Sequence, residues 1–237
     1  LRHNNVSCLT TTSDGGIGIY SSTENSINAF TEATYTNWDF DNTWFIIDGE
    51  TRPMLRSEYS TTITNAHQLQ LMAIDLTADY TLANDIDLSA TKDNASDIWN
   101  IAKGFDPIGD GTTGFTGNLD GLGHTISDLT VNRASEDKVG LFGEISGGSI
   151  SNIGLVDNSI IGNDHTGGVV GKVGVNSTII NSYSTGAVSG NNYIGGLSGS
   201  NFEYSSKIIN SYSTGAVNGN NHIGGFVGLN YGTIANS

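Results

Sequence analysis

Cysteine, proline and basic residues are all scarce in this chain of 237 residues. Cys8 is the only cysteine, which excludes an internal disulfide and a metal site built from several cysteines. Proline occurs twice, and the 32 glycines follow no Gly-X-Y period, so a collagen helix is excluded. No apolar run approaches the ~20 residues of a membrane-spanning helix, so we expect no membrane insertion.

The scarcity of positive charge limits the partners. The chain has nine Lys and Arg residues against 24 Asp and Glu residues, which gives a formal net charge of −15. Phosphate binding needs clustered Lys and Arg, so we expect no nucleic-acid partner. The acidic residues are concentrated at or before Asp137, and the later ones are Glu144, Asp157, Asp164 and Glu203. The last hundred residues therefore depend on Asn, Ser and Thr for solubility.

An internal repeat dominates the C-terminal half of the chain. Ile179–Gly196 and Ile208–Gly225 are identical except at Ser189/Asn218 and Tyr193/His222. Weaker copies extend the register through a glycine pattern, VGLFG, GGVVG, GGLSG and GGFVG, and through an asparagine that follows apolar residues. The second residue of the glycine pattern recurs at intervals of 28, 28 and 29: Gly140, Gly168, Gly196 and Gly225. The asparagine recurs at intervals of 29, 29 and 26: Asn152, Asn181, Asn210 and Asn236.

One arc of each repeat is nearly fixed in length, and the other is free to change. From the asparagine to the next glycine marker the distance is 16, 15 and 15 residues. From the end of each glycine pattern to the next asparagine it is 9, 10, 11 and 8 residues. An arc of fixed length must stack on its neighbours, whereas an arc of variable length is free to bulge outward. We therefore expect display loops after Gly143, Gly171, Gly199 and Gly228.

Short apolar runs separated by glycine and asparagine predict strands, because a helix needs roughly 10–12 uninterrupted residues. Gly and Asn supply the positive φ angles of sharp corners, and stacked asparagines hydrogen-bond along an axis. The sequence therefore predicts an all-β protein, a right-handed parallel β-solenoid. Because strand edges at a solenoid end need a cap or a neighbour, we expect adjacent solenoid segments as partners.

The two ends of the chain resemble interior sequence. Leu1-Arg2-His3-Asn4-Asn5 has neither the basic start nor the apolar stretch of a signal peptide, and Ala235-Asn236-Ser237 stands within a further copy of the repeat. We expect an excerpt or a processed product in which the array continues.

The less regular part of the chain precedes the repeats. A pattern from Thr64 predicts one short helix near 65–73, with Thr64 or Asn65 as N-cap. Strand or strand-turn patterns follow at 80–88, 105–109, 115–121 and 123–131. We divide the chain into 1–56, a closing segment of a preceding array, 57–138, irregular opening coils, and 139–237, the regular repeats. Trp38 and Trp44 are expected to plug the open end of a core.

These patterns resemble a known group of surface proteins. The glycine pattern together with INSYSTGAV resembles the GLUG repeat of large bacterial surface proteins. LANDIDLSA and FTGNLDGLGHTISDLTV resemble the start of the β-helix in filamentous-haemagglutinin-like adhesins, and NWDFDNTW with GETRPMLR resembles a segment that closes such an array. The resemblance implies a cell-surface or extracellular location. GLUG repeats also occur beside the protease domain of IgA-cleaving metallopeptidases, and a solenoid fold does not fix function.

Several histidines and aspartates have either a chemical or a structural interpretation. None of the histidines stands in the HExxH context of a zinc protease: His3, His67, His124, His165 and His222. Asp85/Asp87 and Asp39/Asp41 are i, i+2 pairs that would share one face of a strand for acid–base chemistry or calcium. Solvated acids on a polar face are the preferred interpretation. Asp39-Phe40-Asp41-Asn42-Thr43-Trp44 starts like an EF-hand loop but lacks the glycine at the sixth position.

Two further patterns concern glycosylation and sugar binding. Asn94-Ala95-Ser96 and Asn176-Ser177-Thr178 match the N-glycosylation sequon, which a chain rich in Asn, Ser and Thr contains by chance. Tyr183 and Tyr212 would form an exposed stripe for sugars or, as we prefer, a simple stack. We assign no catalytic, cofactor-binding or metal-binding residue and expect no cofactor.

The sequence thus predicts a structural and adhesive stalk segment of a secreted or surface-anchored bacterial protein rather than an enzyme. It would present loops to host-cell or matrix glycans and proteins, or join copies of itself in an extracellular filament or biofilm. The alternative is a β-helix polysaccharide-cleaving enzyme or the accessory region of a secreted peptidase. Nearly identical repeats favour the scaffold, because an active site needs differentiated residues.

Overall fold

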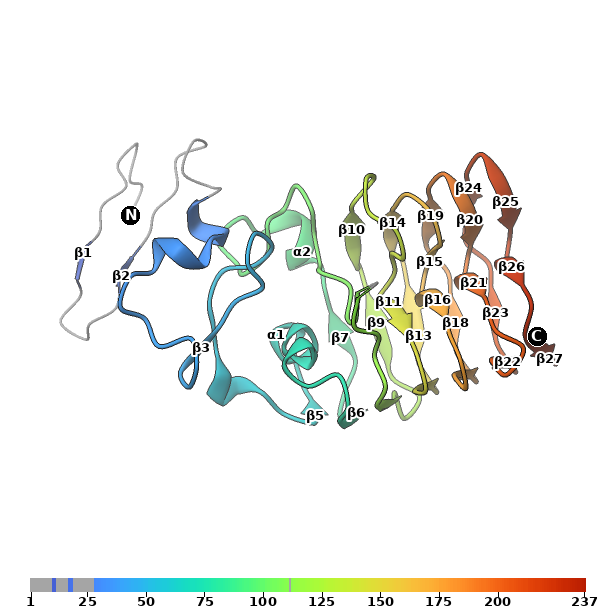
Figure 1. The fold of residues 1–237 in the computed structure, drawn as a ribbon, viewed down its shortest axis with the longest axis horizontal. Helices are drawn as coiled ribbons and strands as arrows, with labels where there is room; N and C mark the ends of the chain where they lie inside the picture. Colours follow the sequence, from blue (N-terminus) through green and yellow to red (C-terminus); the bar gives the residue numbers. More distant parts are fainter. Residues whose placement is uncertain (1–9, 12–16, 19–27, 111) are drawn as a thin grey trace.

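The computed structural model describes residues 10–11, 17–18, 28–110 and 112–237, so His3 and Cys8 lie outside the described residues. Strands stack along the long axis of the molecule from β5 (Thr62–Ile63) to β27 (Thr233–Ala235), and α1 (Ala66–Gln70) lies at the β5 end of the stack (Figure 1). Within the described ranges, no helix is long and apolar enough to cross a membrane.

Five parallel sheets run along the stack in the described part of the chain. Sheet 1 contains β27, β22 (Lys207–Ile209), β17 (Thr178–Ile180), β12 (Ser149–Ser151), β8 (Asn118–Asp120), β6 (Asp79–Leu82) and β5. Sheet 2 contains β23 (Tyr212–Ser213), β18 (Tyr183–Ser184), β13 (Gly154–Val156), β9 (Thr125–Ser127) and β7 (Ile86–Asp87). Sheet 3 contains β24 (Val217–Asn218), β19 (Ala187–Ser189), β14 (Ser159–Ile161) and β10 (Thr130–Asn132). Sheet 4 contains β25 (Asn221–Gly224), β20 (Asn192–Gly195) and β15 (Thr166–Gly167), and sheet 5 contains β26 (Val227–Asn230), β21 (Ser198–Asn201), β16 (Val170–Val173) and β11 (Phe142–Ile145).

The regular coils from β12 to β26 visit sheets 1 to 5 in turn, and with the less complete coils at either end the solenoid has about four turns. Ile150 pairs with Ile179, and Ile179 pairs with Ile208, in parallel register in sheet 1. All three side chains are fully buried. The repeat therefore places the same residue at the same depth in successive coils, and the predicted parallel β-solenoid is confirmed.

The corner between sheets 1 and 2 is an asparagine in left-handed conformation. Asn152, Asn181 and Asn210 have φ angles of 52°, 50° and 49°. The Nδ2 group of Asn210 donates to Oδ1 of Asn181 at 3.1 Å, and Asn152 donates in the same way to Asp120 at 2.9 Å. Asparagine suits this corner because it tolerates positive φ better than most residues and still carries a donor and an acceptor. The predicted asparagine ladder is confirmed.

The glycine pattern brings sheets 4 and 5 into backbone contact. A Cβ atom on Gly199 would lie 2.4 Å from the carbonyl carbon of His165 and 2.5 Å from the amide nitrogen of Thr166. A Cβ atom on Gly195 would lie 2.1 Å from the carbonyl oxygen of Ser198. Contact distance rather than φ therefore demands glycine here, because these strands pack with no side chain between them.

The predicted helix covers one end of the hydrophobic core. α1 and the 3-10 helix η4 (Leu71–Ile74) fully bury Leu69, Leu71 and Met72. The Asn65 side chain accepts a hydrogen bond from the Gln68 amide at 2.9 Å, so Asn65 is the N-cap. A second short helix, α2 (Ala90–Asp93), follows β7 and was not predicted.

Residues 28–56 contribute short elements before the solenoid: η1 (Asn28–Phe30), η2 (Glu32–Thr34), β3 (Trp44–Phe45) and β4 (Met54–Leu55), followed by η3 (Arg56–Glu58). β3 and β4 pair antiparallel, as do β1 (Thr10–Thr11) and β2 (Ile17–Gly18). Contrary to expectation, Trp38 and Trp44 pack on each other, with centroids 4.2 Å apart, and neither belongs to the core cluster of the described residues. Trp99 lies in that core instead, because its Nε1 group finds a buried acceptor in Gln70 Oε1 at 2.8 Å.

A buried arginine joins residues 28–56 to the solenoid. The Arg133 side chain is 2% exposed, and its Nη2 atom lies 2.8 Å from Glu50 Oε2 and 2.9 Å from Asp106 Oδ1. Its Nη1 atom lies 3.0 Å from Glu136 Oε2. Burial raises the pKa of Asp106 to about 6, although the positive charge of Arg133 opposes this shift.

The variable arcs form loops between sheets 5 and 1, at residues 146–148, 174–177, 202–206 and 231–232. Val175 is 47% exposed and Tyr204 is 87% exposed, so the second and third loops present apolar groups to solvent. Most of the length differences read from the sequence therefore lie at one edge of the rod, and a single extra residue lies between sheets 2 and 3 of one coil.

Candidate functional site

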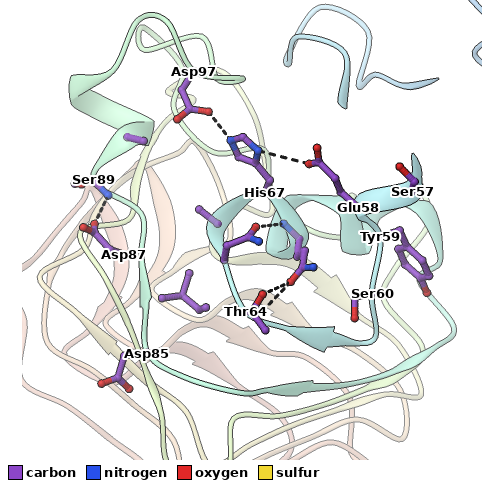
Figure 2. Close-up of a pocket in the computed structure, with 15 residues that line it drawn as sticks. Ser57, Glu58, Tyr59, Ser60, Thr64, His67, Asp85, Asp87, Ser89 and Asp97 are labelled. Carbon is purple, nitrogen blue, oxygen red and sulfur yellow. Dashed lines mark hydrogen bonds and ion pairs between the residues drawn. The ribbon is translucent and has the colours of Figure 1, made fainter. Parts of the chain in front are cut away.

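A cleft of about 850 Å³ opens beside α1. Its walls come from the loop after η3, the first turn of α1, β7 with its flanking residues, and the loop after α2. Figure 2 shows the carboxylates and the histidine that line it, which are Glu58, His67, Asp85, Asp87 and Asp97. The cleft is the natural place to look for chemistry because it concentrates carboxylates around an imidazole.

His67 is held between two carboxylates (Figure 2). Its Nε2 atom lies 2.6 Å from Asp97 Oδ1, and its Nδ1 atom lies 3.8 Å from Glu58 Oε2. Its ring also meets Trp99 edge-on, with centroids 5.6 Å apart. This arrangement links η3, α1 and the loop after α2, and it aims neither ring nitrogen at a nucleophile.

Asp85 and Asp87 lie on the wall of the cleft opposite η3 (Figure 2). Asp85 Oδ1 accepts a hydrogen bond from the Thr125 amide at 2.8 Å and lies 3.3 Å from His124 Nδ1. Asp87 Oδ1 accepts a hydrogen bond from the Ser89 amide at 2.8 Å. These backbone amide bonds hold the pKa of both carboxyls below the usual range, so both are anions at neutral pH. A general acid needs the opposite shift.

The other aspartate pair lies outside the cleft. Asp39 Oδ1 accepts hydrogen bonds from the amides of Asn42 at 2.9 Å and Asp41 at 3.1 Å, which lowers the pKa of Asp39. Asp39 therefore closes its own turn instead of sharing a face with Asp41. Across the described ranges, no group of three or more His, Cys, Asp or Glu side chains could hold a metal ion.

Two histidines and three tyrosines of the repeats form ring ladders. His165 and Tyr193 stack with centroids 4.6 Å apart, and Tyr193 and His222 stack with centroids 4.8 Å apart. Tyr183 and Tyr212 stack at 4.9 Å with an interplanar angle of 3°. The sequence placed His222 opposite Tyr193 but missed His165. Its distance from Tyr193, one repeat length, was the available signal.

The two sequons differ in setting. Asn94 and Asn176 are both exposed. The Asn94 side chain accepts a hydrogen bond from the Ser96 amide at 3.1 Å, whereas Ser177 is fully buried.

Comparison with known protein families identifies the repeat. Residues 190–218 match the GLUG motif, a range that holds the end of one asparagine arc, a complete glycine pattern and the 202–206 loop. The chain therefore carries the GLUG repeat that its glycine pattern predicts.

Two proteins of known sequence are similar over about half of the chain. Halomucin of Haloquadratum walsbyi is 45% identical over 125 residues, which cover 51% of this chain and 1% of halomucin. A putative Gly-rich membrane protein of Evansella cellulosilytica is 31% identical over 115 residues, which cover 48% of this chain and 11% of that protein. The chain thus matches a small part of the length of each.

One solved structure has a distant likeness. The crystal structure of a putative immunoglobulin A1 protease from Bacteroides ovatus has a TM-score of 0.45 and 21% identity, and the match covers 73% of this chain and 63% of that chain. A likeness this distant says nothing about activity.

Proposed function

We propose that this chain is a structural and adhesive stalk segment of a large secreted or surface-anchored protein, and that its variable arcs attach to cells, matrix or surfaces. The observation that carries the proposal is the division of each coil into two arcs. Sheets 1 to 4 keep their register from coil to coil, while the loops between sheets 5 and 1 change in length. A stiff rod with one variable edge suits reach and display. The match to short stretches of much longer proteins supports a segment of this kind.

A neighbouring solenoid coil is the partner we propose for the β25–β27 face. Ile223 is 40% exposed and Ile234 is 37% exposed, whereas their partners in the preceding coil, Ile194 and Ile208, are fully buried. A further coil, of this or another molecule, would cover these side chains and pair the open strand edges. α1 covers the opposite end of the core, so stacking of copies end to end would need that cap to move. The division at residues 56 and 138 stays a prediction.

An enzyme is the alternative, and it would use the cleft. We do not favour it, because Asp85 and Asp87 lack the proton that a general acid must supply, and both ring nitrogens of His67 face carboxylates.

Attachment of coated beads tests the proposal. Beads that carry the whole chain should bind saturably to at least one member of a panel of epithelial cells, bacteria and immobilised matrix polymers. Exchange of residues 174–176 and 202–205 for Gly-Ser segments of equal length, which keeps the buried Ser177 and Ser206, should abolish this binding and leave the circular dichroism spectrum unchanged. Beads that stay inert toward the whole panel would reject the adhesive part of the proposal.

A further inference from the structure

An aromatic surface over sheets 4 and 5 lies apart from both the core and the cleft. His165, Tyr193 and His222 each have a left-handed backbone, with φ of 55°, 60° and 55°, at the start of sheet 4. Their rings stack along the axis at the distances given above. The Nδ1 atom of His165 lies 2.9 Å from Ser200 Oγ on β21, so the ladder reaches across sheet 5.

The variable arcs extend this ladder into a continuous chain of rings. Phe202 meets His165 edge-on at 6.0 Å and meets Tyr231 edge-on at 5.7 Å between centroids. Tyr231 in turn lies 6.5 Å from Tyr204. We call these six rings the outer aromatic patch: His165, Tyr193, Phe202, Tyr204, His222 and Tyr231.

The patch is partly open to solvent: His165, Tyr193 and Phe202 are half-buried, whereas Tyr204, His222 and Tyr231 are exposed. Tyr204, in the loop before the last complete coil, is 87% exposed, and Tyr231, in the last coil, is 51% exposed. None of the six rings belongs to the core cluster found among the described residues. Because an exposed ring gains little from folding, a contiguous group of them marks a surface that contacts something else.

Several of the residues that differ between otherwise similar coils lie in the patch. The pair Tyr193/His222 is one of two differences between the near-identical segments of the sequence. Phe202 and Tyr204 belong to loop 202–206, the longest of the four variable loops. Variation at these positions gives each coil its own surface while the rest of the repeat preserves the rod.

Charges of both signs surround the patch, and the carboxylates of Asp164 and Glu203 are next in sequence to its rings. Lys172 lies 4.9 Å from the centroid of the Phe202 ring, and its Nζ atom pairs with Glu144 Oε1 at 3.0 Å. Burial, and after it the charge of Lys172, lowers the pKa of His165, so this imidazole is neutral at pH 7. Asn192 and Asn221, each next to a ladder ring in sequence, are joined side chain to side chain at 2.8 Å. Because His165, Tyr193 and His222 stack on one another, the ladder covers its own ring faces, and the exposed rings for stacking are Tyr204 and Tyr231. Exposed rings beside amides and hydroxyls match a ligand with C–H faces and hydroxyl edges, which is the chemistry of a sugar ring.

We propose that the outer aromatic patch binds a neutral polysaccharide, with sugar rings stacked on Tyr204 and Tyr231 and the chain continuing along the ladder. Successive coils are about 4.8 Å apart, a step comparable to one sugar unit of an extended chain. An anionic polymer would need clustered basic residues, which the patch does not offer. This inference deepens the proposed attachment function and rests on it.

Affinity electrophoresis of the whole chain tests the inference. Native gels would contain dextran, mannan, galactomannan or hydroxyethyl cellulose, with alginate as the anionic counterpart. At least one neutral polysaccharide should retard the wild-type chain, and the double variant Y204A/Y231A should bind about tenfold more weakly or worse. Y212A is the matched control because Tyr212 is 50% exposed but lies in sheet 2, so Y212A should migrate like the wild type. Y204S alone provides a second variant with little risk to folding.

Several results would overturn the inference. These are the absence of retardation by every neutral polysaccharide, retardation by alginate alone, and equal retardation of wild type, Y204S and Y204A/Y231A. The bead assay separates this failure from failure of the attachment function. Beads that adhere to cells equally well with Y204A/Y231A would keep the stalk proposal and remove the sugar site.

Discussion

Asn181 donates a hydrogen bond from its Nδ2 group to Oδ1 of Asn152, one coil away, at 3.0 Å. Both residues also turn the chain at the corner between sheets 1 and 2 with a left-handed backbone. One side chain therefore supplies the corner and the rung of the ladder, which explains why asparagine and not glycine recurs at this position.

Replacement of Asn181 should separate these two roles. Asn181→Ala loses the rungs to Asn152 and Asn210 and also places alanine, which tolerates a left-handed backbone less well than asparagine, at φ of 50°, so we expect a loss of about 2–4 kcal/mol of unfolding free energy. Asn181→Gly keeps the corner and loses only the rungs, so about 1–2 kcal/mol should be lost. Urea unfolding followed by circular dichroism measures both. Equal losses in the two variants would contradict the assignment of a backbone role.

The contact between sheets 4 and 5 predicts that alanine substitutions at two glycines of the same pattern change the stability by very different amounts. Gly199→Ala would drive a methyl group into the backbone of His165 and Thr166, so we expect a loss of about 3 kcal/mol or more. Gly225→Ala is the control, because a Cβ atom there has no neighbour within 4 Å, and its stability should stay within about 0.5 kcal/mol of wild type. Similar thermal midpoints for the two variants would refute close packing as the reason for the pattern.

The buried cluster around Arg133 predicts a defined pH dependence. The pKa of Asp106 rises from 3.8 to about 6 on folding, so the folded state binds more protons between these values. Its contribution to stability is therefore full below about pH 3.8 and is lost as the pH rises through 6. Asp106→Asn resembles the protonated carboxyl and should gain up to about 3 kcal/mol relative to wild type between pH 4 and 7.

Asp93→Asn controls for the change in net charge, because Asp93 is exposed on α2. The midpoints of urea unfolding of the wild type and the two variants are compared at pH 4 and at pH 7. If the stability of Asp106→Asn changed with pH in the same way as that of the wild type, protonation of Asp106 would not contribute to the pH dependence of stability.

The formal charge of −15 predicts that salt stabilises the fold. Raising NaCl from about 0.1 M to 1 M shortens the screening length from about 10 Å to about 3 Å and weakens repulsion among the acidic residues. The thermal midpoint should rise, and KCl should act like NaCl because screening depends on ionic strength. A midpoint that falls with salt would show that ion pairs outweigh repulsion.

The sequence predicted features that depend on periodicity or on neighbouring residues. The parallel coils and the asparagine ladder follow from positions that recur once per repeat, and the Asn65 cap follows from local helix chemistry. The link from Arg133 to Glu50 was not predicted, because it joins two non-repetitive segments across a large sequence distance. The same holds for His67 and Asp97, which only the folded cap brings together.

The surface chemistry was predicted in part. Spacing placed Tyr193 opposite His222, but it gave no sign that Phe202 in a loop would meet His165 of the preceding coil. Loop conformation depends on packing, and loops of different length share no register from which to read a contact. The prediction that Trp38 and Trp44 plug the open end of the core was wrong for a related reason, because composition alone does not say which aromatic rings belong to the same core.

Insertion of one short segment at two positions tests the division between fixed and free arcs most directly. The same four residues, Gly-Ser-Gly-Ser, would be inserted between Glu203 and Tyr204 in the variable arc, and between Gly186 and Ala187 in the fixed arc. The unfolding free energy in urea should fall by less than about 1 kcal/mol for the first insertion, because lengthening a surface loop costs little. The second should cost about 3 kcal/mol or more, or prevent folding, because it breaks the register of β19 with β14 and β24. Equal costs at the two positions would contradict a rod that tolerates insertion mainly at one edge.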